Sequence, residues 1–135
     1  MATQIFINLP VTDLQQSIRF YEHIGFTNNP QFTDETAACM VLNEHIYVML
    51  LTHDKFKQFT PKAISNAKES SEVLNALTLA SRDEVDNFIS IAINHGGNEF
   101  RPTQDYGFMY GRAFEDLDGH IWELIYMDMN QFPQQ

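Results

Sequence analysis

One carboxylate stands out because it interrupts a run of apolar residues. Glu123 lies in the middle of segment 121–125, which otherwise reads as an apolar strand (IWELI). A carboxylate that faces an apolar interior is unfavourable unless it is paired, hydrogen-bonded or protonated. Glu123 is therefore a candidate to anchor a ligand or to act as a general base. The alternative is a structural carboxylate that Arg112, Tyr110 or Asn75 satisfies.

Other candidate ligand-binding residues share strand faces. Tyr110 and Arg112 alternate in a strand over 108–115, so they project from one face. On an inner face, their phenol and guanidinium would suit an anionic or oxygenated ligand. On an outer face, Arg112 would lie in solvent. Phe6 and Asn8 likewise share a face of the first strand, where Phe6 is expected to fill the interior, the alternative being a stacking contact.

The composition describes one folded domain without a nucleic-acid or membrane partner. The chain has 135 residues, 44% of them hydrophobic, and 11 are Phe, so a substantial core is expected. The net charge of −10 argues against binding a phosphate backbone. No apolar run long enough to span a membrane occurs, and the first residues lack the features of a secretory signal. The single cysteine, Cys39, is expected to be a small buried hydrophobe in a cytoplasmic protein.

The elements predicted for the first half are a strand, a helix and three strands. A capping box of Thr12 and Gln15 starts the helix, and Gly25 ends it. Short polar breaks separate the later strands, as in hairpins. The predicted strands cover 4–9, 26–33, 36–43 and 45–52.

The same order of elements recurs in the second half. Ser81 and Glu84 form a second capping box, and Gly96-Gly97 ends the second helix. Asp118-Gly119 is a strong hairpin signal because both residues tolerate positive φ. The predicted strands cover 75–80, 98–100, 108–115 and 120–127.

A direct comparison of the two halves makes an internal repeat explicit. An offset of 71 aligns Asp13 with Glu84 and Gly25 with Gly96 without a gap. An offset of 75 aligns segment 45–47 (HIY) with segment 120–122 (HIW). The change of offset implies four extra residues in the second half, around 101–106. Duplication of one βαβββ unit is the simplest interpretation.

The boundaries within this single domain follow from the repeat. The first module covers about 1–52, the second about 73–128, and a tail covers 129–135. The linker, 53–72, contains Thr60-Pro61, the pattern of an N-cap followed by proline at the first helical position. A short helix from there to about Lys68 is expected, either as a brace on a sheet or as a lid.

Two long segments resemble a known superfamily. Segments 11–21 (VTDLQQSIRFY) and 24–26 (IGF) resemble the opening of vicinal oxygen chelate proteins. Segment 114–124 (FEDLDGHIWEL) is similar to their D-P-D-G-x-x-x-E-L ending, with Leu117 in place of the usual proline. The superfamily includes glyoxalase I, extradiol dioxygenases, fosfomycin-modifying enzymes and bleomycin-resistance proteins. Shorter segments resemble a bacterial branch labelled glyoxalase-like: 29–32, 47–53 and 105–112.

The resemblance implies a fold and, in many relatives, a metal site. The implied fold is α+β, with two βαβββ modules whose curved sheets surround a shared cavity, and many relatives are dimers. Metal-dependent members carry His or Glu at four strand positions, which hold a divalent ion with open positions for substrate oxygens. Carried over one by one, those positions fall on Phe6, Val48 (Met49 after a register slip), Asn75 and Glu123. Only Glu123 suits such an ion, so no metal cofactor is expected.

The function expected from these residues is binding of a small organic molecule. The first hypothesis is a metal-independent, bleomycin-resistance-like homodimer that sequesters its ligand. An alternative is a glyoxalase-like enzyme of the lactoylglutathione lyase type, or a dioxygenase-like one, with a rearranged metal site or Glu123 as base. A third is an interaction domain whose cavity is filled by Phe6, Met109 and Trp122. The candidate ligand-binding residues are Phe6, Asn8, Asn75, Tyr110, Arg112 and Glu123.

Overall fold

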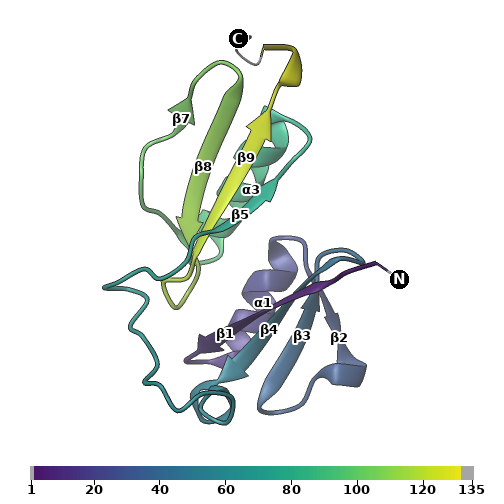
Figure 1. The fold of residues 1–135 in the computed structure, drawn as a ribbon, viewed down its shortest axis with the longest axis vertical. Coiled ribbons are helices and arrows are strands. Elements are labelled where there is room, and N and C mark those ends of the chain that lie inside the picture. The colour runs from purple at the N-terminus through teal and green to yellow at the C-terminus, as the bar shows by residue number, and fades with distance from the viewer. Residues whose placement is uncertain (1, 132–135) are drawn as a thin grey trace. The chain divides into compact units, whose positions relative to one another are not determined.

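The computed structural model describes residues 2–131 and confirms the α+β class. The chain divides into two compact units at Asn66–Ala67, and each unit holds one sheet and one long helix (Figure 1). None of the helices within residues 2–131 has both the length and the apolar character needed to cross a membrane.

The first unit contains a four-stranded sheet in the order β1-β4-β3-β2. β1 runs parallel to β4, while β3 is antiparallel to both β4 and β2. This is the pairing expected when a helix connects β1 back to the same sheet. The elements are β1 (Ile5–Val11), α1 (Leu14–His23), β2 (Thr27–Asn29), a 3₁₀ helix (Pro30–Phe32), β3 (Ala37–Val41), β4 (Ile46–Thr52) and α2 (His53–Phe56).

The second unit repeats this arrangement with one interruption. Its sheet has the order β5-β9-β8-β6, and the short β7 also pairs with β8. β5 is parallel to β9, and the remaining pairs are antiparallel. The elements are β5 (Asn75–Thr78), α3 (Arg82–Asn94), β6 (Asn98–Glu99), β7 (Gln104–Asp105), β8 (Met109–Glu115), β9 (Ile121–Met127) and a 3₁₀ helix (Met129–Gln131).

The helix caps correct one part of the predicted alignment. Asp13, rather than Thr12, caps α1 by accepting a hydrogen bond from the Gln16 backbone N–H at 3.1 Å. Ser81 caps α3 as predicted, accepting from the Glu84 N–H at 3.1 Å. The helix that follows is 13 residues long in the second unit and 10 in the first. The gapless offset of 71 is therefore wrong at the start of the helices, because α3 carries three additional residues.

The linker helix lies earlier than predicted. α2 occupies His53–Phe56, capped by Thr52, whose hydroxyl accepts from the Lys55 N–H at 3.3 Å. Thr60 makes only a local turn, with its hydroxyl accepting from the Lys62 N–H at 3.2 Å, and no helix forms over 60–68. The side chains in that stretch are mostly exposed, so a short helix there would lack the packing that stabilises helices in proteins.

The first strand also extends beyond its predicted end. β1 continues through Pro10 to Val11, two residues beyond the predicted range of 4–9. β1 is an edge strand, and an edge tolerates the missing N–H of proline on its open side.

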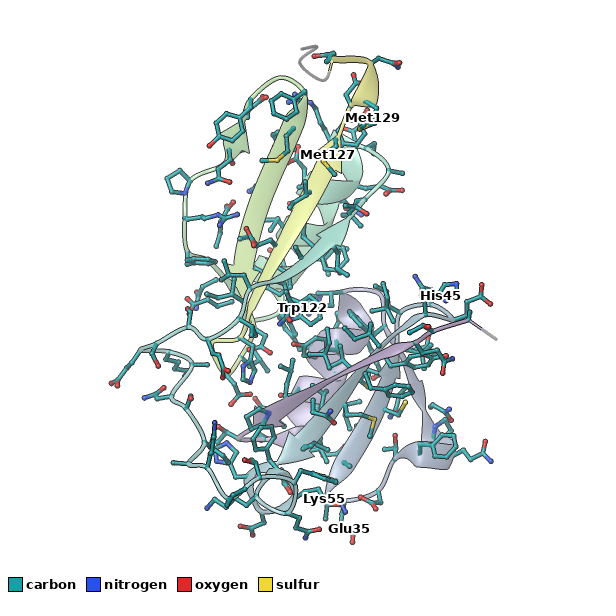
Figure 2. The ribbon with its side chains drawn as sticks, in the orientation of Figure 1. Glu35, His45, Lys55, Trp122, Met127 and Met129 are labelled. Carbon is teal, nitrogen blue, oxygen red and sulfur yellow. The ribbon has the colours of Figure 1, made fainter. Side chains whose placement is uncertain are left out.

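Each core lies between a sheet and its helix. In the first unit, Val11, Tyr21 and Val48 are fully buried, and in the second Val85, Phe114 and Trp122 are. Phe88 of α3 stacks on Phe114 of β8, with ring centroids 6.1 Å apart. Figure 2 labels Trp122 and Met127 near the two ends of β9. Trp122 is 1% exposed and Met127 40% exposed, so the buried part of β9 lies toward its beginning.

The predicted hairpin at Asp118-Gly119 provides a test of this packing. Gly119 has φ of +92°, and a Cβ there would lie 2.8 Å from the Lys68 backbone nitrogen and 2.9 Å from the Ala67 carbonyl carbon. Gly119→Ala should destabilise the protein by about 2–4 kcal/mol in denaturant unfolding, since it combines backbone strain with a clash. Gly107→Ala is the matched control, because φ there is +80° and the nearest atom is 3.9 Å away. Equal losses in both variants would show that the 67–68 segment does not pack on this hairpin.

Candidate functional site

The two faces of the second sheet have different surroundings. Phe114 stacks on α3, and its partner in the ladder is Trp122, while Arg112 is paired with Leu124. Residues paired across strands share a face, and neighbours along a strand alternate. Glu123 and its partner Ala113 therefore project from the face away from α3.

On this face Glu123 is paired with an arginine that the sequence did not suggest. Arg101 Nη2 donates to Glu123 Oε2 at 2.7 Å. The two side chains are 22% and 17% exposed, respectively, so solvent screens the pair only partly. None of the three expected partners contacts Glu123. The carboxylate is thus accommodated in an apolar strand by one guanidinium.

The position of Arg101 follows from an interruption in the edge of the sheet. β6 pairs with β8 at Glu99↔Phe114, and β7 pairs with β8 at Gln104↔Gly111. Segment 100–103 lies between these two pairings and leaves the ladder. An edge strand that departs from its ladder can redirect a side chain across the sheet. Arg101 is thereby able to reach Glu123 on β9.

The sequence limits the possible cationic partners of Glu123 but does not identify Arg101. The extra residues of the second half were assigned to 101–106, and Arg101 is the first of them. After Lys68 the chain contains only three Lys or Arg side chains, at Arg82, Arg101 and Arg112. A half-buried carboxylate in this half had few possible cationic partners. Only the strand pairing shows which of them shares its face.

Tyr110 and Arg112 lie on the α3 side and do not approach Glu123. Arg112 makes a two-point contact with Glu99, each bond 2.8 Å, and donates to Asp86 of α3 at 2.8 Å. The Tyr110 hydroxyl donates to the same Asp86 oxygen at 2.5 Å. Arg112 is therefore not free in solvent, in contrast to the expectation for an outer face, and neither residue is hydrogen-bonded to Glu123.

The electrostatics of this cluster show that its charges are mutually satisfied. The contact with Glu99 raises the pKa of Arg112. Burial would raise the pKa of Asp86, but hydrogen bonds from Tyr110 and Arg112 outweigh it and lower the pKa. The hydrogen bond to Asp86 raises the pKa of Tyr110. Such a network fixes α3 and β6 to β8.

A second ion pair extends the same network along the edge. The Arg82 guanidinium lies 4.7 Å from the centre of the Tyr110 ring and contacts both Asp105 oxygens, at 2.7 and 3.0 Å. These hydrogen bonds lower the pKa of Asp105 to about 2. The pair connects the start of α3 to β7. Arg82 also donates to the Gly107 carbonyl at 3.2 Å, so all of these contacts are with the β7–β8 edge.

Asn75 also lies on the α3 side. It pairs with Trp122, whereas Ala76 pairs with Glu123, so Asn75 and Glu123 project from opposite faces. The predicted third metal position is therefore displaced by one residue. The residues of β5 that share the face of Glu123 are Ala76 and Thr78.

In the first unit, the strand pairing separates Phe6 from Val48. Phe6 pairs with Tyr47 and its ring stacks on the tyrosine ring, with centroids 4.4 Å apart and planes 6° apart. Asn8 pairs with Met49, so these four side chains share one face and Val48 lies on the other. Phe6 is 47% exposed, so it does not fill the interior as expected.

The equivalent of Glu123 in the first unit is Met49 rather than Val48. The Leu42 N–H donates to the Ile46 carbonyl, and the Asp116 N–H donates to the His120 carbonyl, closing the two corresponding hairpins. These hairpins are 74 residues apart, one fewer than the predicted offset of 75. The register slip considered for Met49 is therefore the observed register.

The residues now aligned with the superfamily positions do not fit a divalent metal. Asn8 pairs with Met49 as Ala76 pairs with Glu123, so these positions contribute an amide at Asn8 beside the Phe6 ring, a thioether at Met49, a methyl group at Ala76 and one carboxylate at Glu123. Within residues 2–131, no three or more His, Cys, Asp or Glu side chains are grouped so that they could hold a metal ion. The carboxylate that remains already contacts a cation. Divalent metals at such sites require several imidazole or carboxylate ligands.

Comparisons with known proteins identify the fold. No family model and no curated protein matches the sequence. A hypothetical protein from S. aureus is 27% identical, has a TM-score of 0.77, and is matched over 93% of this chain and 95% of that chain. A glyoxalase/bleomycin resistance protein/dioxygenase family enzyme from Burkholderia phytofirmans PsJN is 14% identical, with a TM-score of 0.77 over 93% and 99% of the two chains.

A third solved structure belongs to an antibiotic resistance protein. The fosfomycin resistance protein FosX from Mesorhizobium loti is 15% identical, with a TM-score of 0.69 over 97% of each chain. At this level of identity, the similarity concerns the fold alone. The chain has the glyoxalase/bleomycin resistance/dioxygenase fold, which confirms at the level of fold its resemblance to the vicinal oxygen chelate superfamily.

Proposed function

We propose that the protein binds a small organic molecule without a divalent metal, in the manner of a sequestering protein of the bleomycin-resistance type. The observation that carries this proposal is the Glu123–Arg101 pair, 2.7 Å apart, on the face of the second sheet away from α3. A pair of polar groups beside otherwise apolar residues can orient a ligand in a binding site.

The residues paired with Glu123 in the sheet have small side chains. Its partners on the two adjacent strands are Ala76 and Ala113. Their single methyl groups occupy little volume beside the carboxylate. On the opposite face, the corresponding positions are filled by large side chains such as Trp122 and Phe114, which pack against α3. The small side chains are thus on the face with the polar pair.

The arginine also supports metal independence. A guanidinium 2.7 Å from the carboxylate would repel a divalent cation placed at the same oxygens. It also occupies a lone pair that the metal would need. The binding mode proposed for Glu123 is therefore hydrogen bonding within an ion pair, in place of coordination.

The filled-interior alternative has less support. It requires Phe6, Met109 and Trp122 to occupy one interior. Trp122 is buried on the α3 side of its sheet, and Phe6 is almost half exposed. The burial of these two aromatic rings therefore does not support a single interior that both of them fill.

Replacement of Glu123 tests the proposal through both stability and binding. Because Arg101 is a partner, Glu123→Gln should destabilise the free protein by about 1–2 kcal/mol, instead of stabilising it as expected for an unpaired carboxylate. It should also weaken a ligand found in a metabolite library screen by about 1.5–3 kcal/mol, the scale of a charged hydrogen bond. Denaturant unfolding and calorimetric titration measure the two effects, and the binding should persist with EDTA present.

Glu99→Gln is the matched control for this variant. Glu99 is also a partly buried carboxylate bonded to an arginine, but it lies in the cluster on the α3 side. The Glu99→Gln variant should lower the free energy of unfolding without changing the affinity for the ligand. Equal affinities in wild type and Glu123→Gln would contradict the proposed site, even if stability fell.

We also propose that the protein is a homodimer. β1 and β5 each form one edge of a sheet, and β1 carries Ile5 and Phe6, which are 53% and 47% exposed. Open apolar edges are usually covered by another chain or element. Light scattering at micromolar concentration should give twice the 15.6 kDa chain mass. A single 15.6 kDa species across that range would reject the dimer.

A further inference from the structure

Arg101 retains hydrogen-bonding capacity beyond its contact with Glu123. A guanidinium has five N–H donors, and the contact with Glu123 uses Nη2 alone. Its Nε is buried and has no hydrogen-bond partner among residues 2–131. By contrast, Arg112 uses Nε and both terminal nitrogens for carboxylates. A buried donor without a partner is unfavourable, so the described protein groups leave Arg101 incompletely hydrogen-bonded.

Glu123 has a complementary acceptor. Its Oε2 accepts from Arg101, while Oε1 accepts no hydrogen bond from any other residue that the structure describes. The pair thus presents donors and an acceptor side by side. This pattern matches a ligand that carries an oxyanion and a hydrogen-bond donor on neighbouring atoms.

We propose that Arg101 and Glu123 form a two-point site for a small organic acid with a hydroxyl or ammonium group next to its carboxylate. The carboxylate binds the unused Nη N–H groups of Arg101, and the hydroxyl or ammonium donates to Glu123 Oε1. This inference rests on the proposed function and specifies its ligand class. The planar guanidinium suits a carboxylate because the two groups can form parallel hydrogen bonds.

The protein's negative charge does not prevent such a ligand from binding. The net charge is −10, but charges farther away than about 8 Å are largely screened at physiological ionic strength. The local field at the pair is set by a guanidinium and a carboxylate that neutralise one another. A ligand with both a negative and a donor group complements both members, whereas a simple anion satisfies only the arginine.

The test uses 2-hydroxy acids and their neutral amides as probes. Lactate and mandelate supply the carboxylate next to a hydroxyl, and lactamide and mandelamide keep the hydroxyl without the negative charge. Thermal unfolding should show stabilisation of the wild type by the acids and not by the amides, since a ligand stabilises according to its affinity for the native state. Arg101→Gln should weaken acid binding by about tenfold to a hundredfold, the effect of losing charged hydrogen bonds.

Arg19→Gln is the control for the change in net charge. Arg19 is an exposed residue of α1, so its replacement should leave acid binding unchanged. If Arg101→Gln does not fold because Glu123 loses its partner, the double variant Arg101→Gln/Glu123→Gln removes both charges and replaces the ion pair with an amide pair. The double variant should fold and lose the preference for acids over amides.

Three results would overturn the inference. These are equal stabilisation by acids and amides, unchanged acid binding in Arg101→Gln or the double variant, and no stabilisation of the wild type by any of the acids. The proposed function can be tested separately from this inference. A library ligand whose affinity falls in Glu123→Gln but not in Arg101→Gln would support small-molecule binding at this face while rejecting the two-point acid site.

Discussion

The alternation of side chains along β9 is the constraint on which the rest of the second unit depends. The face that carries Trp122 and Leu124 is covered by α3, and both of these side chains belong to the core. Glu123 is between them and must project from the other face. A shift of one residue would bury the carboxylate against α3 and expose the tryptophan. Hydrophobic burial of two large side chains therefore sets the direction of one polar group.

The same constraint separates two groups of charges that look alike in sequence. Arg112 and Arg101 are both half-buried arginines that contact carboxylates. Arg112 is saturated by Glu99 and Asp86 and connects three elements on the helix side. Arg101 makes one contact with a carboxylate on the opposite face and keeps a buried donor without a partner. The first arrangement is complete as a structural network, whereas the second has capacity for a ligand.

Much of the fold could be predicted from sequence, because local signals determined it. The two helices end before Gly25 and Gly96, both of which have positive φ, and Ser81 caps its helix as expected. The registers of the strands were harder to predict from the sequence. A helix longer by three residues and a hairpin offset of 74 moved the implied metal positions from Val48 to Met49 and away from Asn75. One-residue shifts change the face of a side chain, and apolar sequence patterns do not reveal them when both neighbours are apolar.

The partner of Glu123 could not be predicted for a related reason. Tyr110 and Arg112 lie near it in sequence and on a neighbouring strand, but their faces are fixed by Asp86 on α3. Arg101 comes from segment 100–103, which has no strand periodicity. Contacts from irregular segments depend on tertiary structure, so residue spacing contains little information about them.

Arg101 lies 2.7 Å from the Glu123 carboxylate, and the proposed function requires that this guanidinium, rather than a divalent metal, neutralises it. Elemental analysis of protein purified without chelators tests it most directly. The purified protein should contain far less than one equivalent of zinc, nickel, manganese or iron per chain. Adding these ions should not raise its thermal stability. About one tightly bound equivalent per chain, lost on chelation together with ligand binding, would contradict it.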